Sequence, residues 1–397
     1  MSGKTKVGDI GEFTNHDPRN TPADSYAKYA EWRQKCPVAH SDAFGGFYLF
    51  NRYADVRAAA KDWQTYSSAE GFTLPPLPVP AWAIGADPPQ QTRERALFKE
   101  ILNNDMYRRF GDHAKEDVAN LIEAFLPDGE VDLIEAICEP LPVLTICGMI
   151  GLTAEEAIRV RPVAIETFEA TNDTDLASRA NVKFNALVKE LSDARRAEPQ
   201  DDFMTRVATE PIDGRMFSDD EIGNLLQGIL IAGHHTTTSA MSSLFRHILI
   251  EPRLKQQLID DPELVRPAVE ETLRLNTPLH MFGRTTQCPV TVNDVDLPDH
   301  SFVMLNWASA NRDPEVFEEP DEFRLDRSPN PHVAFGFGVH TCVGAQLARI
   351  ELQVATQELL SRVPDIELAA EPPSYEFSGG NLAILPELRA KFKAQPR

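Results

Sequence analysis

Cys342 is the residue of this chain whose surroundings most clearly indicate chemistry. It follows the segment FGFGVHT (residues 335–341), and a helix is predicted to begin just after Val343 and Gly344. Gly336 and Gly338 allow a tight turn and a close approach to something flat or bulky. The N–H groups and positive dipole end of the helix would lower the pKa of a thiol placed there. A thiolate presented in this way is a nucleophile or a metal ligand.

Several roles compete for this cysteine. A nucleophile would need a partnered base, for which His340 is the only nearby candidate. A zinc site would need further Cys or His residues at ligand spacing, and the sequence supplies none. A haem iron needs only one thiolate because the porphyrin supplies four nitrogens. The ordinary role of a lone cysteine is that of a small buried hydrophobe, against which the glycines and the helix start argue.

The composition excludes several classes of protein. The chain has 397 residues, with 39 Lys and Arg against 61 Asp and Glu, giving a formal net charge of −22. Such acidity argues against binding nucleic acid or anionic lipid. The five cysteines are an odd, sparse set, and no apolar run reaches the ~18 residues that span a membrane. We therefore expect a soluble, cytoplasmic protein with no nucleic-acid or membrane partner.

A long central helix is the clearest element that could position a site. It is predicted from Ser218 to about Ile250, beginning with a capping box between Ser218 and Glu221 and ending at Glu251-Pro252. Its middle is apolar on nearly all faces, so we expect it to be buried. Further helices are predicted over residues 87–102, 133–150, 155–171, 176–197, 262–274 and 344–362, and short strands over 46–50, 288–296, 301–307 and 382–385. The fold class expected is mainly α with small β-sheets, in a single large domain.

The segment of residues 335–344 resembles the haem-binding signature of the cytochrome P-450 family, F-G-x-G-x-H-x-C-x-G, at every fixed position. The resemblance extends over roughly residues 20–390. It implies a haem domain over residues 20–397, with residues 1–19 as an extension and the long helix over the haem. It also implies that Cys342 is the axial ligand of haem b and that His340 bonds a propionate. Phe335 would pack beside the sulfur, and Gly336 and Gly344 belong to the same cofactor-binding segment.

Other segments match the family in the same order. Glu271 and Arg274 fit its E-x-x-R ion pair, and Arg312 and Arg327 are both candidates for a third partner. By resemblance, Arg95 and Arg284 would reach the haem propionates. Gln91 occupies a position that is often His in the family.

The long helix contains Ala232-Gly233-His234-His235-Thr236-Thr237, which is similar to the family pattern A-G-x-(D/E)-T-T. The resemblance implies that Gly233 leaves room for dioxygen and that Thr236 hydrogen-bonds it. His235 stands where the acid should be. It either replaces the acid as a proton relay, since the ordinary pKa of histidine is near neutrality, or it packs while water carries the protons.

The resemblance also implies a substrate pocket. Its lining is overwhelmingly apolar and has no Arg or Lys, which favours a small neutral lipophile such as a terpenoid or simple aromatic. Gln227, His280 and Asn381 could each give one hydrogen bond to such a guest. The residues expected in the pocket are Phe72, Leu74, Leu77, Val79, Trp82, Ile84, Gln227, Ile231, Ala232, Leu279, Met281, Phe282, Asn381 and Leu382. The loop of residues 71–86, rich in proline and free of charge, either lines this pocket or tucks onto the core.

The function implied is a haem-thiolate monooxygenase that uses O2. The chain has no flavin signature, so electrons must come from separate proteins, a ferredoxin with its NAD(P)H-dependent reductase or a flavodoxin-like donor. Arg93, Arg108 and Arg109 are the residues expected to face an acidic ferredoxin. Two alternatives remain open, a peroxide-driven or otherwise atypical haem-thiolate oxidase and a haem-thiolate sensor without turnover.

Overall fold

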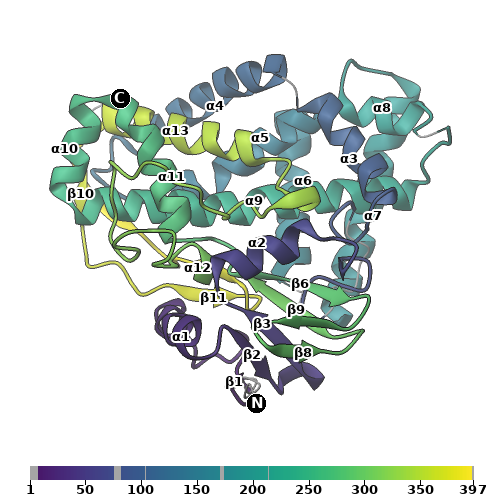
Figure 1. The fold of residues 1–397 in the computed structure, drawn as a ribbon. Coiled ribbons are helices and arrows are strands. Elements are labelled where there is room, and N and C mark those ends of the chain that lie inside the picture. Colours follow the sequence, from purple (N-terminus) through teal and green to yellow (C-terminus); the bar gives the residue numbers. More distant parts are fainter. Residues whose placement is uncertain (1–7, 76–81, 103, 170–173, 213, 396–397) are drawn as a thin grey trace, which may run out of the picture.

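The computed structural model describes residues 8–75, 82–102, 104–169, 174–212 and 214–395. Most of the helices lie together on one side of the molecule, and the larger sheet lies on the other side with α1 next to it (Figure 1). The predicted fold class, mainly α with small sheets, is confirmed. The helices are α1 Pro22–Lys35, α2 Tyr53–Lys61, α3 Gln90–Ile101, α4 Asn104–Phe125, α5 Pro140–Ile150, α6 Ala154–Glu169, α7 Thr174–Ala197, α8 Phe203–Thr209, α9 Asp219–Ile250, α10 Pro252–Asp260, α11 Val265–Leu275, α12 Trp307–Ala310 and α13 Ala345–Arg362.

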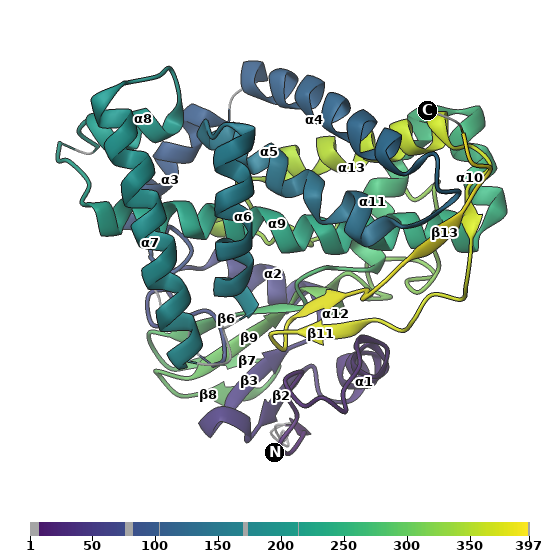
Figure 2. The same cartoon turned by 180° about the vertical axis from the view of Figure 1, so that it is seen from behind.

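Helix α9 crosses the middle of the molecule, as both views show (Figures 1 and 2). The side chain of Ser218 accepts the N–H of Glu221, and the Glu221 carboxylate accepts the N–H of Ser218, so the predicted capping box is formed. The helix packs against α5, α7 and α13. Because it is covered on several sides, most of the apolar side chains in its middle are buried.

The strands in the described part of the chain form one larger and three small sheets. The larger sheet has the order β1-β2-β3-β9-β6-β4, and β6 runs antiparallel to β9 with Arg284 opposite Val303. A three-stranded sheet, β10-β13-β5, joins distant parts of the chain. The strands are β1 Gly8–Asp9, β2 Val38–Ser41, β3 Phe47–Phe50, β4 Tyr66–Ser67, β5 Glu130–Asp132, β6 Met281–Thr286, β7 Val290–Val292, β8 Val295–Leu297, β9 Phe302–Asn306, β10 Glu367–Leu368, β11 Glu376–Ser378, β12 Leu382–Ile384 and β13 Arg389–Lys391.

Two predicted elements are divided in the structure. The strand expected over residues 288–296 is a hairpin, β7 and β8, because Asn293 and Asp294 both adopt positive φ (48° and 63°). Positive φ at two central residues is the requirement of a tight type I′ hairpin turn. The helix expected over residues 133–150 consists of a π-helical turn, Ile134–Cys138, followed by α5.

The described part of the expected N-terminal extension packs onto the fold. Strand β1 pairs in parallel with β2, and the ring of Phe13 lies edge-on to Trp32 with centroids 4.7 Å apart. Among the described residues, no helix is both long and apolar enough to cross a bilayer.

Candidate functional site

The segment that carries Cys342 follows α12 in the chain and leads into α13. Cys342 donates its backbone N–H to the carbonyl of Phe335 at 2.8 Å, which closes a loop around a short 3-10 turn, Gly338–His340. Gly338 adopts a φ of +76°, and a Cβ there would lie 2.3 Å from the carbonyl oxygen of Ala60. The glycine is therefore required both by its backbone conformation and by the close approach of α2.

Cys342 is exposed as a residue, although many protein atoms surround its thiol. Burial raises its pKa, while backbone N–H groups of Gly344 and Ala345 and the charges of Arg95 and Arg349 act in the opposite direction. The N–H groups at the helix start lower the thiol pKa, as predicted, but burial outweighs them, so the net pKa of the thiol is raised. A thiolate at this position must therefore be stabilised by a cation that binds the sulfur.

Three basic side chains gather near this segment. Arg95 on α3 donates to the carbonyl of Thr341 at 2.7 Å, and Arg284 on β6 is buried with its guanidinium donating to the carbonyl of Gly283. His340 bonds the hydroxyl of Ser68 through Nε2 at 3.1 Å. Burial, reinforced by Arg284 and Arg95, lowers the pKa of His340 to about 3, and burial lowers the pKa of Arg284 to about 10.

These groups fit a cofactor with two carboxylates. Within the described residues, the contacts of Arg95 and Arg284 are to backbone carbonyls rather than to acidic side chains, and Nδ1 of His340 is buried without a hydrogen-bond partner. Asp87, whose field reaches Arg284, already accepts hydrogen bonds from Ser67 and Ser68. A buried cation such as Arg284 and a half-buried one such as Arg95, both without an acidic partner there, are suited to the propionates of a haem. Gln91 is buried and supports the loop by donating to the carbonyl of Val339 at 2.5 Å.

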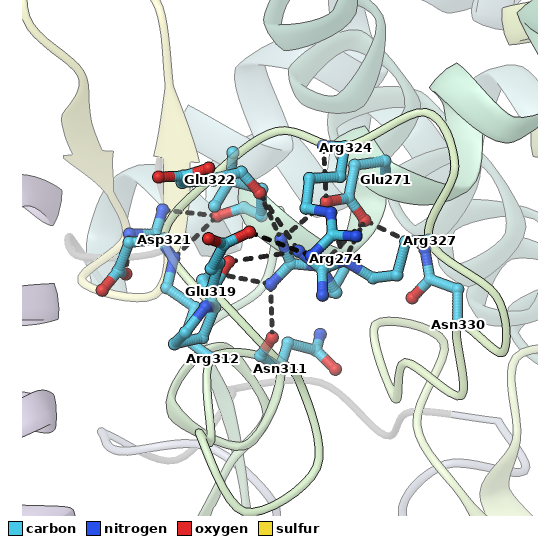
Figure 3. A network of polar contacts seen from close by, with 12 residues as sticks. Glu271, Arg274, Asn311, Arg312, Glu319, Asp321, Glu322, Arg324, Arg327 and Asn330 are labelled. Carbon is cyan, nitrogen blue, oxygen red and sulfur yellow. Dashed lines mark hydrogen bonds and ion pairs between the residues drawn. The ribbon is translucent and has the colours of Figure 1, made fainter.

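A polar network is centred on Glu271 of α11 (Figure 3). Arg274 donates to both Glu271 oxygens at 2.8 and 2.9 Å, and both side chains are fully buried. Arg327 donates to the same carboxylate at 3.0 and 3.1 Å and is thus the third partner. Arg312, the other candidate, instead bonds the carbonyl of Leu275 and pairs with Asp321.

Helix α9 has an accessible patch in its middle. Ala232 is exposed and its neighbours Ile231 and Gly233 are half-buried, whereas the next residues on either side are buried. Thr236 donates its hydroxyl to the carbonyl of Ala232 at 2.8 Å, so its oxygen can accept a further hydrogen bond. A Cβ on Gly233 would lie 2.7 Å from Cδ1 of Ile146, so this glycine also permits the close packing of α5 on α9.

His235 lies beside His234, with ring centroids 4.3 Å apart. Burial lowers the pKa of His235 to about 3, the neighbouring His234 adds to this, and a hydrogen bond to the backbone of Ile231 opposes it. The premise that its pKa is near neutrality is therefore wrong. At pH 7 His235 is a neutral imidazole, which can still accept a proton at one nitrogen while the other donates.

The expected pocket residues are placed as follows. Phe72 and Phe282 meet edge-on at 5.6 Å, Leu279 and Leu382 form a β-bridge, and Trp82 contacts Phe217. Met281 packs in the buried cluster that includes Phe13 and Trp32. Leu77 and Val79 lie outside the described residues. Leu74, Ile84 and Ile231 are partly buried. Gln227 is buried, and its Nε2 has no hydrogen-bond partner among the described residues.

Two polar side chains expected near the pocket have other partners. Asn381 accepts the N–H of Met281 and donates to its carbonyl, which fixes the turn before β12 onto β6. His280 is fully buried among Tyr26, Tyr29 and Phe377, and burial lowers its pKa to about 3.

The arginines expected to face a redox partner lie on α3 and α4. Arg93, Arg108 and Arg109 are all exposed. Sequence reasoning missed Ser68, which hydrogen-bonds His340, and Asp87, whose charge acts on Arg284. The only signal for them was their position on either side of the proline-rich loop.

Comparison with known proteins places this geometry in a family. A family model described as Cytochrome P450 matches residues 174–393. A β-dihydromenaquinone-9 ω-hydroxylase of Mycobacterium tuberculosis is 32% identical over 97% of this chain and 79% of its own length. A nocardicin C N-oxygenase of Nocardia uniformis is 35% identical over 94% of this chain and 98% of its own. A solved cytochrome P-450 from Chondromyces apiculatus is 25% identical, with a TM-score of 0.86 covering 99% of this chain and 100% of that one. The chain therefore belongs to the cytochrome P-450 family and is a monooxygenase.

Proposed function

We propose that this cytochrome P-450 inserts one oxygen atom from O2 into a small, neutral, hydrophobic substrate, of the size of a terpenoid or simple aromatic. The observation that supports the proposal is the absence of charge among the residues that we assign to the pocket. The described pocket residues include no Arg, Lys, Asp or Glu, and the loop before α3 that contributes several of them is apolar. A charged guest would lose its hydration there without gaining a partner.

As a member of the family, the protein uses haem b with an axial cysteine thiolate, and we assign this ligand to Cys342. Arg95, Arg284 and His340 would hold the propionates, and Gln91 would support them through Val339. When bound, the haem supplies the activation of O2 and the transfer of one oxygen atom.

Two residues of α9, Thr236 and His235, would transfer protons to the bound O2. Thr236 can accept a hydrogen bond while its own proton is held by Ala232, and rotation of the hydroxyl would release that proton toward the patch beside it. His235 is neutral at working pH, so its role is to accept and pass on a proton rather than to carry a stored one. Electrons would come from a ferredoxin and its reductase, or from a flavodoxin-like donor.

Matched ligand pairs test the substrate class. Each pair consists of a neutral lipophile, such as a cyclic terpene alcohol or an aromatic methyl ester, and a carboxylic acid with the same carbon skeleton. We expect the neutral member to displace the water on the haem at lower concentration, as followed by the Soret shift. The ligand that binds should then yield a monooxygenated product with ferredoxin, reductase and NAD(P)H. Tighter binding of the acids across the panel would refute the neutral-substrate assignment.

The neutral state of His235 favours one alternative, an oxidation driven by peroxide. Peroxide already carries the two protons and two electrons that an acid and a redox partner would otherwise deliver, so the protein then needs only a group that moves a proton from one peroxide oxygen to the other, which a neutral imidazole can do. Turnover with hydrogen peroxide, but none with reductase and NAD(P)H, would establish this alternative.

A further inference from the structure

Glu270, the residue before Glu271 on α11, has a separate set of partners. Its Oε1 accepts from Nε of Arg349 at 2.6 Å, and its Oε2 accepts from a terminal guanidinium nitrogen of Arg349 at 2.9 Å and from Nε2 of His332 at 3.0 Å. Successive helical residues point about 100° apart, so the carboxylates of Glu270 and Glu271 cannot share one environment. Glu271 thus serves the network of Arg274 and Arg327, and Glu270 serves a different one.

The partners of Glu270 flank the cysteine on both sides. In the sequence His332 precedes Cys342, whereas Arg349 follows it on α13. The guanidinium of Arg349 lies over the ring of Phe335, 4.5 Å from its centroid, and the ring of His332 is 6.0 Å from the same ring. The carbonyl of Phe335 accepts the N–H of Cys342. A continuous path therefore runs from Glu270 through Arg349 and Phe335 to the backbone of Cys342.

The hydrogen bonds of His332 define how it takes part. Nδ1 accepts the backbone N–H of Ala334 at 3.3 Å, so the ring proton lies on Nε2, which donates to Glu270. The ring thereby ties the backbone just before Phe335 to α11. Its side chain is 3% exposed, so water does not compete for these bonds.

The charge on Glu270 is secured by the same contacts. Burial by itself would raise the pKa of Glu270, but the hydrogen bonds from His332 and Arg349 lower it to about 2. The Glu270–Arg349 pair is bidentate and partly buried, with side-chain exposures of 24% and 27%. Such geometry makes an ion pair more effective than an ordinary surface pair.

We propose that Glu270, acting through Arg349, His332 and Phe335, is a positioning residue that holds the cysteine loop in its ligand-bearing conformation. These four residues are called the Glu270 clamp. The proposal rests on the assignment of Cys342 as the haem ligand. It gives α11 two separate functions, the Glu271 network and the Glu270 clamp on the loop itself.

The first test follows the thiolate bond directly. In the reduced carbon monoxide complex of the holoenzyme, the red-shifted Soret band reports thiolate ligation. We expect Glu270→Gln to lose this band several-fold faster than wild type in moderate urea, with a much smaller change in the unfolding midpoint measured by far-UV circular dichroism. Glu263→Gln, an exposed charge removal just before α11, is the matched control and should behave as wild type.

The second test uses Arg349→Lys, which keeps the positive charge but loses the planar stacking on Phe335. It should lose the thiolate band faster than wild type and more slowly than Glu270→Gln. If Glu270→Gln does not retain haem, Arg349→Lys carries the test by itself. Band lifetimes of both variants equal to that of Glu263→Gln would overturn the proposal.

The third test is the sign of the change in haem reduction potential. Glu270→Gln leaves the positive charge of Arg349 uncompensated near the thiolate and should raise the potential, whereas Arg349→Gln leaves the negative charge of Glu270 and should lower it. A generally loosened structure would shift both variants in the same direction, and that outcome would contradict the clamp. A wild-type protein without any red-shifted band would instead refute the assignment of Cys342, which separates the two failures.

Discussion

At the scale of single residues, Cys342 and Cys288 are both exposed cysteines in very different surroundings. Cys342 lies beside Arg95 and Arg349, whereas Cys288 follows β6 near an exposed hairpin. We expect Cys342→Ser to abolish the red-shifted Soret band of the reduced carbon monoxide complex, because serine oxygen does not replace a thiolate. Cys288→Ser is the control and should keep the full band. A persisting band in Cys342→Ser would mean that another residue binds the iron.

His235 gives the second prediction at this scale. Replacing its imidazole by Ala removes a proton acceptor beside Thr236, so we expect less product per NAD(P)H consumed and more peroxide. His235→Asp, which restores the residue type of the family pattern, should keep or improve the ratio. Because the pKa of His235 is about 3, its protonation state does not change between pH 6 and 8, and its contribution to the ratio should be flat there.

The control for His235 is His113→Ala, an exposed histidine on α4 that should leave the ratio unchanged. A ratio in His235→Ala equal to that of wild type would assign proton delivery to water and Thr236. A strong pH dependence that disappears in His235→Ala would show instead that the ring titrates near neutrality.

The residue scale also shows where sequence reasoning stops. The spacing around Cys342 and the pair of Glu271 and Arg274 could be read from the sequence, because each lies within one local segment. The choice between Arg312 and Arg327 could not be made, since it depends on how the loop after α12 folds back. The pKa of His235 was likewise inaccessible, because burial of a helical face by a neighbouring helix sets it.

At the scale of elements, the contact between α13 and α5 holds a buried acid. Glu351 of α13 is 2% exposed, and burial raises its pKa to about 8 while Thr145 of α5 opposes the rise. A carboxyl that keeps its proton in the folded state and loses it on unfolding stabilises the fold fully below about pH 4.5. This stabilisation is lost as the pH rises toward 8.

We therefore expect Glu351→Gln to become progressively more stable than wild type as the pH rises. The difference in free energy of unfolding should grow by about 1.4 kcal/mol per pH unit between pH 4.5 and 8, reaching about 3 kcal/mol near pH 7. Urea unfolding at pH 5, 6, 7 and 8 measures it, with Glu371→Gln as an exposed control. A difference that does not vary with pH would show that Glu351 ionises normally in the folded protein.

The elements themselves were predictable to different degrees. Helix α9 was placed from Ser218 to Ile250 because its cap, its apolar middle and its terminating Pro252 are all local signals. The hairpin of β7 and β8 was read as one strand, because only the left-handed backbone of Asn293 and Asp294 divides it. The separate partners of Glu270 and Glu271 on α11 were missed, since neighbouring glutamates on a helix look like ordinary solvated charges.

At the scale of the whole molecule, the net charge of −22 makes the location of basic residues matter. Arg93, Arg108 and Arg109 are exposed on α3 and α4, whereas Arg253 is exposed on α10 at the opposite end of the molecule (Figures 1 and 2). We expect reversal of the first three to Glu to slow reduction by an acidic ferredoxin about tenfold at low salt and to flatten its salt dependence. Stopped-flow reduction across ionic strengths measures both effects.

Arg253→Glu is the control for this set, because it changes the net charge by the same amount per residue without touching α3 or α4. If Arg253→Glu slowed reduction by the ferredoxin equally, the net charge of the protein, and not a docking face on α3 and α4, would control the reduction rate. Reduction rates that are indifferent to all four changes would remove these arginines from the encounter with the donor.

The three-stranded sheet has a consequence for the order in which the chain can complete its fold during synthesis. Its middle strand, β13, pairs with β10 on one side and with β5 on the other, so that Ala390 lies opposite Val131. During synthesis on the ribosome, β5 emerges roughly 260 residues before β13, the strand with which it pairs. The hydrogen bond from the N–H of Leu133 to the carbonyl of Leu388 can likewise form only after Leu388 has been made. The cysteine loop is therefore made before the sheet is closed, and a nascent chain stalled ahead of Leu388 would present the haem segment on an unfinished fold.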